Sequence, residues 1–293
     1  MNELLAAVRD RLRPHATDAS VERITVGDAA VLVELRAGTT TMAGLAHLPT
    51  GGQPDIDTKD RTVDALLAGV TAEIGDGDAA GGDSATALSE RALGIAAMNA
   101  LSVPLIDWRP GDPMALLSED VEQITTVGLF TPAFRKFEDV EVRVIEREQI
   151  DEVPEPAGVR VRTFTPGEAD EAMADAEVVF VTGSAFIYGG VEAYLDAAPD
   201  SATVVVIGAT ASFLPDPLFA AGVDVVAGAT VTDVAGVRAA LRRGACGTDL
   251  HDAGLTKVYV ARDTPTGIRL GEDASPRGPD TSDRPDGFTT DNI

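Results

Sequence analysis

Cysteine and lysine are scarce in this chain of 293 residues, which has one cysteine, Cys246, and only three lysines. One thiol cannot form an internal disulfide or a cysteine-rich metal site, and this is typical of proteins from a reducing compartment. Uninterrupted apolar runs of roughly 18 residues, as a membrane span needs, are also missing, and the charged N-terminal stretch does not resemble a signal peptide. We therefore expect a cytoplasmic protein without a membrane partner.

Positive charge is also in short supply. The chain has 23 Lys+Arg against 48 Asp+Glu, which gives a formal net charge of −25. Each phosphate contact requires a cation, so this balance argues against a nucleic acid as partner. The preference for arginine over lysine and the dense carboxylate shell are typical of halophilic proteins, which stay soluble in concentrated salt. The net charge thus indicates habitat and says little about function.

Polar alternation is absent from three β-branched runs between Glu177 and Asp233, which read VVFVTGSA, TVVVIGATA and VDVVAGATV. Strands without alternation have both faces buried, as in a parallel sheet covered on both sides. Each run ends in small residues, and ligands of open α/β sheets bind at the carboxyl ends of the strands. We expect the functional site at that edge.

Before these runs, the sequence predicts an α+β unit. It comprises a helix over 2–13 stopped by Pro14, strands at 21–27, 29–35 and 39–48 with a turn at Gly27-Asp28, and helices at 62–70 and 88–101. The fold class that we expect is α/β, with a Rossmann-like parallel sheet after this smaller α+β domain. The predicted divisions are a cap domain at 1–104, a proline-rich linker at 105–121, a Rossmann-like domain at 122–262 and a disordered acidic tail at 272–293.

Strand and helix alternate in the second domain. Strands are expected at 123–130, 141–146, 177–182, 203–208, 223–227 and 257–260, and helices at 132–137, 168–174, 191–197, 217–221 and 234–243. The first strand–helix turn, VGLFTPAF, lacks the G-x-G-x-x-G fingerprint of dinucleotide binding. Gly128 could still allow a ligand to approach, and Glu146 follows at the distance of a ribose-binding carboxylate. The alternative is a turn glycine and a solvated strand end.

Small polar residues follow the next two strands. Thr182, Gly183 and Ser184 end one strand, and Gly208 and Thr210 end its neighbour. Ser184 either caps the following helix or contacts a ligand, together with Tyr188. The surrounding G-S-A-F-I is not the G-x-S-x-G nucleophile elbow, so no serine nucleophile is expected.

Two polar residues of the first domain are further candidates. His47 lies in a small-residue loop that could form a lip over the crevice, or is an ordinary loop histidine. Asn99 is a lone amide in an apolar helix and is either a tie to the backbone or a site residue. Near the C-terminal end of the predicted Rossmann-like domain, Cys246, Asp249 and His251 are all zinc-ligand residue types, but their spacing is poor for a closed tetrahedral site.

Three stretches resemble the heavy-metal chelation domain family, a group first known only as a domain of unknown function. They are ERALGIAAMNALS, TTVGLFTPAFRKFEDVEVRVIERE and FVTGSAFIYGGVEAYLDAAPDSATVVVIGATASFLPDPLFAAGVDVVAGATVTD. The resemblance covers roughly residues 1–262 and implies a cap similar to the enolase N-terminal domain, a Rossmann-like domain and a site between them. Residue by residue, the resemblance implies that the site includes Gly44, His47, Asn99, Gly128, Phe130, Thr182 to Ser184 and Gly208 to Thr210. Relatives often have Gly-Pro where this chain has Ala209-Thr210, which puts the shape of that loop in question.

Two kinds of function are compatible with these residues. The first is binding of a small anionic metabolite or a metal-chelating compound in the interdomain cleft, in metal homeostasis, with a divalent metal ion as the one cofactor considered. The alternative is an enzyme that uses S-adenosylmethionine or NAD in the crevice, with Glu146 as the cofactor contact. No paired acid and base or nucleophile motif decides whether the protein is catalytic, and a homo-oligomer stays open.

Overall fold

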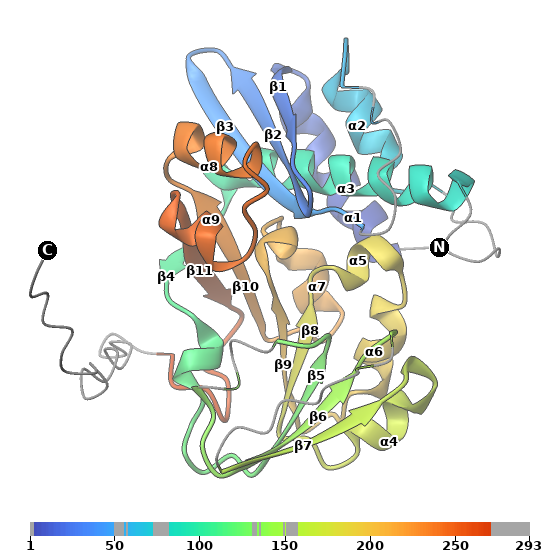
Figure 1. Cartoon of the computed structure of the whole chain (residues 1–293), viewed down its shortest axis with the longest axis vertical. Helices are drawn as coiled ribbons and strands as arrows, with labels where there is room; N and C mark the ends of the chain where they lie inside the picture. The colour runs from blue at the N-terminus through green and yellow to red at the C-terminus, as the bar shows by residue number, and fades with distance from the viewer. Residues whose placement is uncertain are drawn as a thin grey trace, which may run out of the picture.

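The computed structural model describes residues 3–49, 56, 58–72, 82–130, 134, 136–148, 150 and 158–270. Within them, a three-stranded antiparallel sheet lies beside one end of an eight-stranded, mostly parallel sheet (Figure 1). This mixed α/β architecture confirms the expected fold class. No helix in the described ranges is long and apolar enough to cross a membrane.

The N-terminal unit, called the cap below, consists of a helix, a three-stranded meander and two more helices. Its elements are α1 (Glu3–Ala16), β1 (Ala19–Val26), β2 (Ala30–Ala37), β3 (Thr40–His47), α2 (Val63–Gly69) and α3 (Gly82–Ser102). The predicted hairpin is present, with β1 and β2 paired antiparallel on either side of Gly27-Asp28. The predicted stop at Pro14 is wrong, because α1 continues through Pro14 to Ala16. A proline so near the C-terminus of a helix removes only one hydrogen bond of the last turn.

The helix α3 is buried along most of its length and packs closely on β3. A Cβ added at Gly44 of β3 would lie 2.2 Å from the carbonyl oxygen of Ala96 and 2.3 Å from the backbone nitrogen of Ala100. Only glycine permits this approach of strand and helix backbones. The small residues that the sequence shows in this helix therefore serve packing within the cap.

The large sheet has the strand order β4-β11-β10-β9-β8-β5-β6-β7. Its strands are β4 (Arg109–Pro110), β5 (Gln123–Val127), β6 (Val140–Ile145), β7 (Val159–Phe164), β8 (Val178–Thr182), β9 (Thr203–Ile207), β10 (Val225–Val231) and β11 (Leu255–Ala261). The strands from β10 to β7 are parallel, whereas β11 and β4 are antiparallel. The parallel strands run in the Rossmann order 3-2-1-4-5-6, so the chain reverses direction across the sheet between β5 and β8.

The remaining helices are short. They are α4 (Ala169–Met173), α5 (Ala185–Tyr188), α6 (Val191–Ala197), α7 (Asp216–Ala220), α8 (Val234–Leu241) and α9 (Thr248–Asp252), with 3-10 turns at Val103–Leu105 (η1), Pro113–Leu116 (η2), Pro166–Glu168 (η4) and Ala209–Ala211 (η5). Residues of α6 and α7 pack with those of α4 in the core that also contains Val179 and Val206. The opposite face is covered mainly by Phe134, Phe137, Met114 and Ile268 from connecting segments.

Several predicted boundaries need correction. The expected linker contains β4, which pairs with β11 and so belongs to the large sheet. The strand β7 was not expected, although its VRVRTF sequence alternates apolar and polar residues as an edge strand does. The helices α5 and α9 also went unpredicted. In the predicted helix at 132–137, Phe134 and Lys136 have 3-10 geometry. Residues 132, 133 and 135 of that helix, the loop at 51–55 and the tail at 272–293 fall outside the described residues.

The cap and the large sheet share one hydrophobic core, which includes Val33 of β2, Leu93 of α3 and Val206 of β9. On the other face of the cap sheet, Leu32 packs with Val237 and Leu241 of α8. The carboxylate of Glu34 on β2 is buried and accepts two bonds from the Arg238 guanidinium, with Nε to Oε1 at 2.9 Å. The cap is thus held on both faces. The predicted division into a domain at 1–104 and another at 122–262 stays a prediction.

Candidate functional site

The carboxyl ends of β5, β8 and β9 meet at the edge of the large sheet that faces the cap (Figure 1). Glycines end these strands for a steric reason. Gly128 and Gly208 have φ values of +95° and +121°, which side chains rarely adopt, and a Cβ at Gly183 would lie 2.9 Å from the backbone nitrogen of Ala211. The strand ends therefore pack closely on one another where they meet the cap.

Three of the predicted site residues join the cap to this edge. The backbone N–H of His47 donates to the hydroxyl of Thr210 at 3.0 Å. The amide nitrogen of Asn99 lies 2.7 Å from the carbonyl oxygen of Leu45 and 3.1 Å from those of Ala209 and Thr210. Asn99 is 1% exposed. Of the two alternatives for this amide, the bonds match the tie to the backbone.

One atom of that amide is left over. The side-chain oxygen of Asn99 is buried and has no hydrogen-bond partner among the residues that the structure describes. Because the nitrogen faces three carbonyl oxygens, exchanging the two amide atoms would bring like acceptors together. The cap joint thus contains one unsatisfied acceptor, which must be offset by the other contacts of the joint.

The side chain of His47 points to a second group of residues at the same edge. Its Nε2 lies 3.3 Å from the hydroxyl of Tyr188 at the end of α5. The guanidinium of Arg147, just after β6, lies over the Tyr188 ring at 3.5 Å from its centroid. We call His47, Tyr188 and Arg147 the Tyr188 cluster. It lies beside the reversal of strand order between β5 and β8, where open α/β sheets bind ligands.

The electrostatics of the Tyr188 cluster follow from burial and from one cation. Burial, helped by the charge of Arg147, lowers the pKa of His47 below its ordinary value of 6.5, and a backbone hydrogen bond with Ala29 opposes part of this shift. His47 is therefore neutral at pH 7. Arg147 is exposed, and within the described ranges no carboxylate lies at ion-pair distance from it. The cluster therefore presents a cation beside neutral polar groups.

Glu146, the predicted cofactor contact, lies beside the Tyr188 cluster but is already bonded. Its carboxylate accepts the backbone N–H of Leu129 at 3.1 Å and that of Arg147 at 2.8 Å. These bonds hold the loop after β5 against the end of β6, so this carboxylate stabilises a loop in this structure. Phe130 continues the same loop and packs beside the core of the opposite sheet face.

The predicted residues at the end of β8 pair with each other. The hydroxyl groups of Thr182 and Ser184 lie 3.1 Å apart. Ser184 precedes α5 but makes no side-chain capping bond to that helix. Of the two alternatives for Ser184, a helix cap or a ligand contact, the helix cap is therefore not formed in this structure.

Two arginines at this edge escaped the sequence analysis, Arg147 and Arg91. Arg91 of α3 is 6% exposed and donates to the carbonyl oxygens of Ile187 at 2.9 Å and Ala72 at 2.5 Å. Burial lowers the pKa of this guanidinium, and the charge of Glu192 opposes the shift. Arg91 thus fixes α5, which carries Tyr188. A signal was present, since Arg91 is a charged residue directly before the mainly apolar second half of α3.

Metal ligation by the protein alone would need several donor side chains that lie close together. In the part of the chain that the structure describes, no group of three or more His, Cys, Asp or Glu residues gathers in a way that could hold a metal ion. Cys246 is exposed, and the Nδ1 of His251 lies 2.7 Å from the carbonyl oxygen of Leu255. The described residues therefore do not fit a protein-only metal site.

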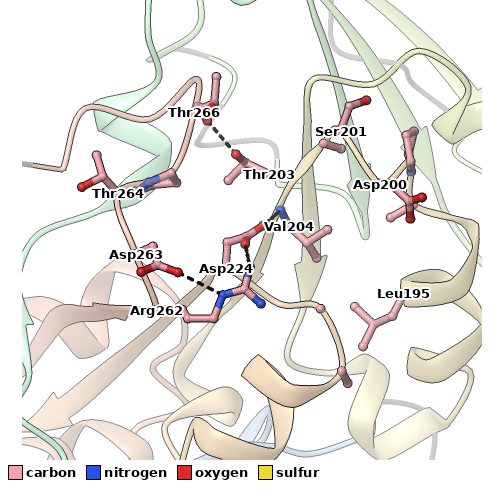
Figure 2. Close-up of a pocket in the computed structure, with 16 residues that line it drawn as sticks. Leu195, Asp200, Ser201, Thr203, Val204, Asp224, Arg262, Asp263, Thr264 and Thr266 are labelled. Atoms are coloured by element: carbon pink, nitrogen blue, oxygen red, sulfur yellow. Dashed lines mark hydrogen bonds and ion pairs between the residues drawn. The ribbon is translucent and has the colours of Figure 1, made fainter.

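A cavity of about 460 Å³ lies away from the Tyr188 cluster, at the amino ends of β9 and β10 (Figure 2). Thr203 and Val204 at the start of β9, Asp224 before β10, and the segment from Arg262 to Thr266 after β11 line it. The cavity lies at the edge opposite the predicted site, and no sequence pattern predicted it.

A Rossmann-like sheet whose carboxyl edge is joined to an α+β cap defines the class of this protein. Residues 112–260, slightly more than half of the chain, match the model of the DUF364 family, which is described as "Putative heavy-metal chelation". The chain belongs to this family, which confirms the resemblance seen in the sequence.

Two solved structures of DUF364-family proteins, both of unknown function, are similar to this chain. The protein from Pyrococcus horikoshii is 21% identical with a TM-score of 0.72, over 88% of this chain and 99% of that chain. The protein from Desulfitobacterium hafniense is 14% identical with a TM-score of 0.64, over 88% of this chain and 98% of that chain. At these identities the likeness establishes the fold alone. Among curated proteins, none matches the chain.

Proposed function

We propose that the protein binds a small anionic compound, either a metabolite or a metal held in a chelate, between the cap and the carboxyl edge of the sheet. The observation that carries the proposal is the Tyr188 cluster. There, Arg147 is stacked on Tyr188, and Tyr188 lies at 3.3 Å from His47 of the cap. The cluster joins residues from both units beside the point where the strand order reverses.

The chemistry of Arg147 favours an anion. A guanidinium presents a planar fork of donors that matches a carboxylate or phosphate group in two parallel hydrogen bonds. In a chain with a net charge of −25, a cation at a strand end without a carboxylate at ion-pair distance in the described ranges offers a local anion site. Neutral His47 and the Tyr188 hydroxyl add uncharged polar atoms that fix orientation.

The family description, heavy-metal chelation, agrees best with a metal that arrives together with its own ligands. Soft metals prefer thiolate and imidazole donors, and the chain has one cysteine and three histidines. A metal complexed by a polycarboxylate is an anion, and the Tyr188 cluster suits its outer oxygens. The metal is then cargo, and the protein recognises the chelate.

The test is calorimetry and native mass spectrometry of the full chain with Ni²⁺ alone, citrate, the nickel–citrate complex, S-adenosylmethionine and NAD. We expect citrate or its nickel complex to bind, and Arg147→Ala to weaken binding about tenfold or more. Arg243→Ala, which removes an exposed arginine elsewhere on the surface, is the matched control and should leave the affinity unchanged.

Two outcomes would overturn the proposal. One is binding that survives Arg147→Ala together with His47→Ala and Ser184→Ala. The other is binding of S-adenosylmethionine or NAD alone, with loss on Glu146→Gln, which would favour the cofactor-dependent enzyme instead. The same mass spectra report the oligomeric state, and the possible homo-oligomer stays a prediction until then.

A further inference from the structure

The cavity at the amino ends of β9 and β10 is separate from the site proposed above, because it lies at the opposite edge of the sheet. Its volume of about 460 Å³ is within the range of small-molecule sites. Figure 2 shows the segment of Arg262 to Thr266 on one side and the loop that carries Asp200 and Ser201 on the other. The cavity is thus formed by connecting segments held on the ends of two neighbouring strands.

One wall of the cavity is fixed by bonds that use its strongest donors. The carboxylate of Asp224 accepts the backbone N–H of Val204 at 2.9 Å and the guanidinium of Arg262 at 2.6 Å. Arg262 also donates to the carbonyl oxygen of Phe219 at 3.2 Å. The hydroxyl of Thr203 donates to the carbonyl oxygen of Thr266 at 2.7 Å. The only cation in the lining is therefore neutralised, which makes this cavity a poor site for anions.

The polar groups that remain include two carboxylates, beside the hydroxyl groups of Ser201 and Thr264. Asp200 has no hydrogen bond or ion pair with any described residue, and Asp263 has only a contact of 3.5 Å with the Nε of Arg262. Their carboxylates lie on opposite sides of the cavity in Figure 2. Leu195, Ala198 and Ala221 also line the cavity, and in Figure 2 Val204 and the Asp224–Arg262 pair lie between the two carboxylates.

These features select one kind of ligand. The lining contains no aromatic ring, so a nucleobase or a quaternary ammonium group would lack its usual partner. Within the described ranges no three carboxylates converge, so direct coordination of a metal ion is not favoured. Two separated carboxylates in a cavity that also has apolar lining groups match a flexible aliphatic chain with a cation at each end, since methylene groups bury against apolar surface while charged ends stay paired.

We propose that this cavity binds a linear aliphatic diamine or polyamine, with one ammonium group at Asp200 and another at Asp263. The methylene chain then lies along Leu195, Ala198 and Ala221, and the Asp224–Arg262 pair forms a fixed wall beside it. This site and the anion site of the Tyr188 cluster are independent, because they use different residues and opposite edges of the sheet.

The test is calorimetric titration of the full chain with putrescine at constant ionic strength, with butylamine as the single-charge probe. We expect saturable putrescine binding that weakens about tenfold or more in the double variant Asp200→Asn/Asp263→Asn, and butylamine to bind about tenfold more weakly than putrescine. The matched control is Asp18→Asn/Glu171→Gln, which removes the same two negative charges from exposed positions elsewhere. It should keep the affinity within about twofold.

Three results would overturn the assignment. They are equal losses in both double variants, which would indicate general attraction to an acidic surface, equal affinities for butylamine and putrescine, or no saturable binding of putrescine. All four substituted residues are exposed, so the variants are expected to fold, and a circular dichroism spectrum of each checks this. Citrate binding at the other edge should be unchanged in all of them, which separates failure here from failure of the anion site.

Discussion

The two edges of the large sheet differ in what covers them. At the carboxyl edge the cap lies against the strand ends, and Asn99, His47 and Thr210 bond across the joint. At the amino edge the ends of β9 and β10 are bordered only by connecting segments, and a cavity of about 460 Å³ remains. Small residues at strand ends therefore serve close packing at the carboxyl edge, while a cavity borders the amino edge.

The edges also differ in charge. The carboxyl edge presents Arg147 and a neutral His47, whereas the amino edge presents Asp200 and Asp263 beside a neutralised arginine. Coulombic attraction of a ligand follows the local charge more than the net charge of the chain when the groups are close. The local charge at the two edges thus differs in sign although the chain as a whole has a net charge of −25.

The largest expected effect concerns the packing that supports the carboxyl edge. Gly44→Ala should destabilise the protein by about 4 kcal/mol or more, or prevent folding, because the new Cβ meets backbone atoms of α3 at 2.2 and 2.3 Å. Urea denaturation followed by circular dichroism measures this change.

The control for Gly44 is Gly38, where nothing lies within 4 Å of an added Cβ but φ is +57°. Gly38→Ala should cost only about 1–2 kcal/mol, for the left-handed backbone alone. Equal costs at the two positions would contradict close backbone packing of β3 on α3 within the cap.

An intermediate effect compares the two edges directly. Asn99→Ala should cost about 2–4 kcal/mol, because it leaves three buried carbonyl oxygens without this donor. Thr264→Ala at the rim of the amino-edge cavity should change the free energy of unfolding by less than about 0.5 kcal/mol, since Thr264 is exposed. If the two variants were equally stable, the carboxyl edge would not be the structural joint described above.

Much of the fold was accessible from the sequence because apolar patterning decides it. The runs that became β8, β9 and β10 lack polar alternation, and this property places them in the buried centre of the parallel sheet. The strand β7 was missed although its arginines alternate with apolar residues, which is itself the pattern of a half-exposed edge strand. The strand β4 has two residues, too few for any period to be recognised.

The candidate site was less accessible, since contacts between distant segments decide it. His47, Asn99 and Thr210 are brought together as expected, but the sequence could not tell that their polar groups bond to one another. Arg147 was overlooked beside Glu146, because only the fold places it over Tyr188. The cavity at the amino edge depends on how three connecting segments pack beside α6 and β9, which no local pattern encodes.

The smallest expected effect is a pH dependence that reports the burial of His47. Its folded-state pKa is lowered below 6.5, so the unfolded state binds the proton more readily. This contribution to stability is fully present above pH 6.5 and is lost as the pH falls through the lowered pKa. The free energy of unfolding of the parent protein, relative to His47→Gln, should therefore decline from pH 7 toward pH 5 in urea denaturation. The matched control is His15→Gln at an exposed position, measured over the same pH range. A parent protein that gained stability over His47→Gln on acidification would mean that His47 is protonated in the folded state, and the Tyr188 cluster would then carry two cations instead of one.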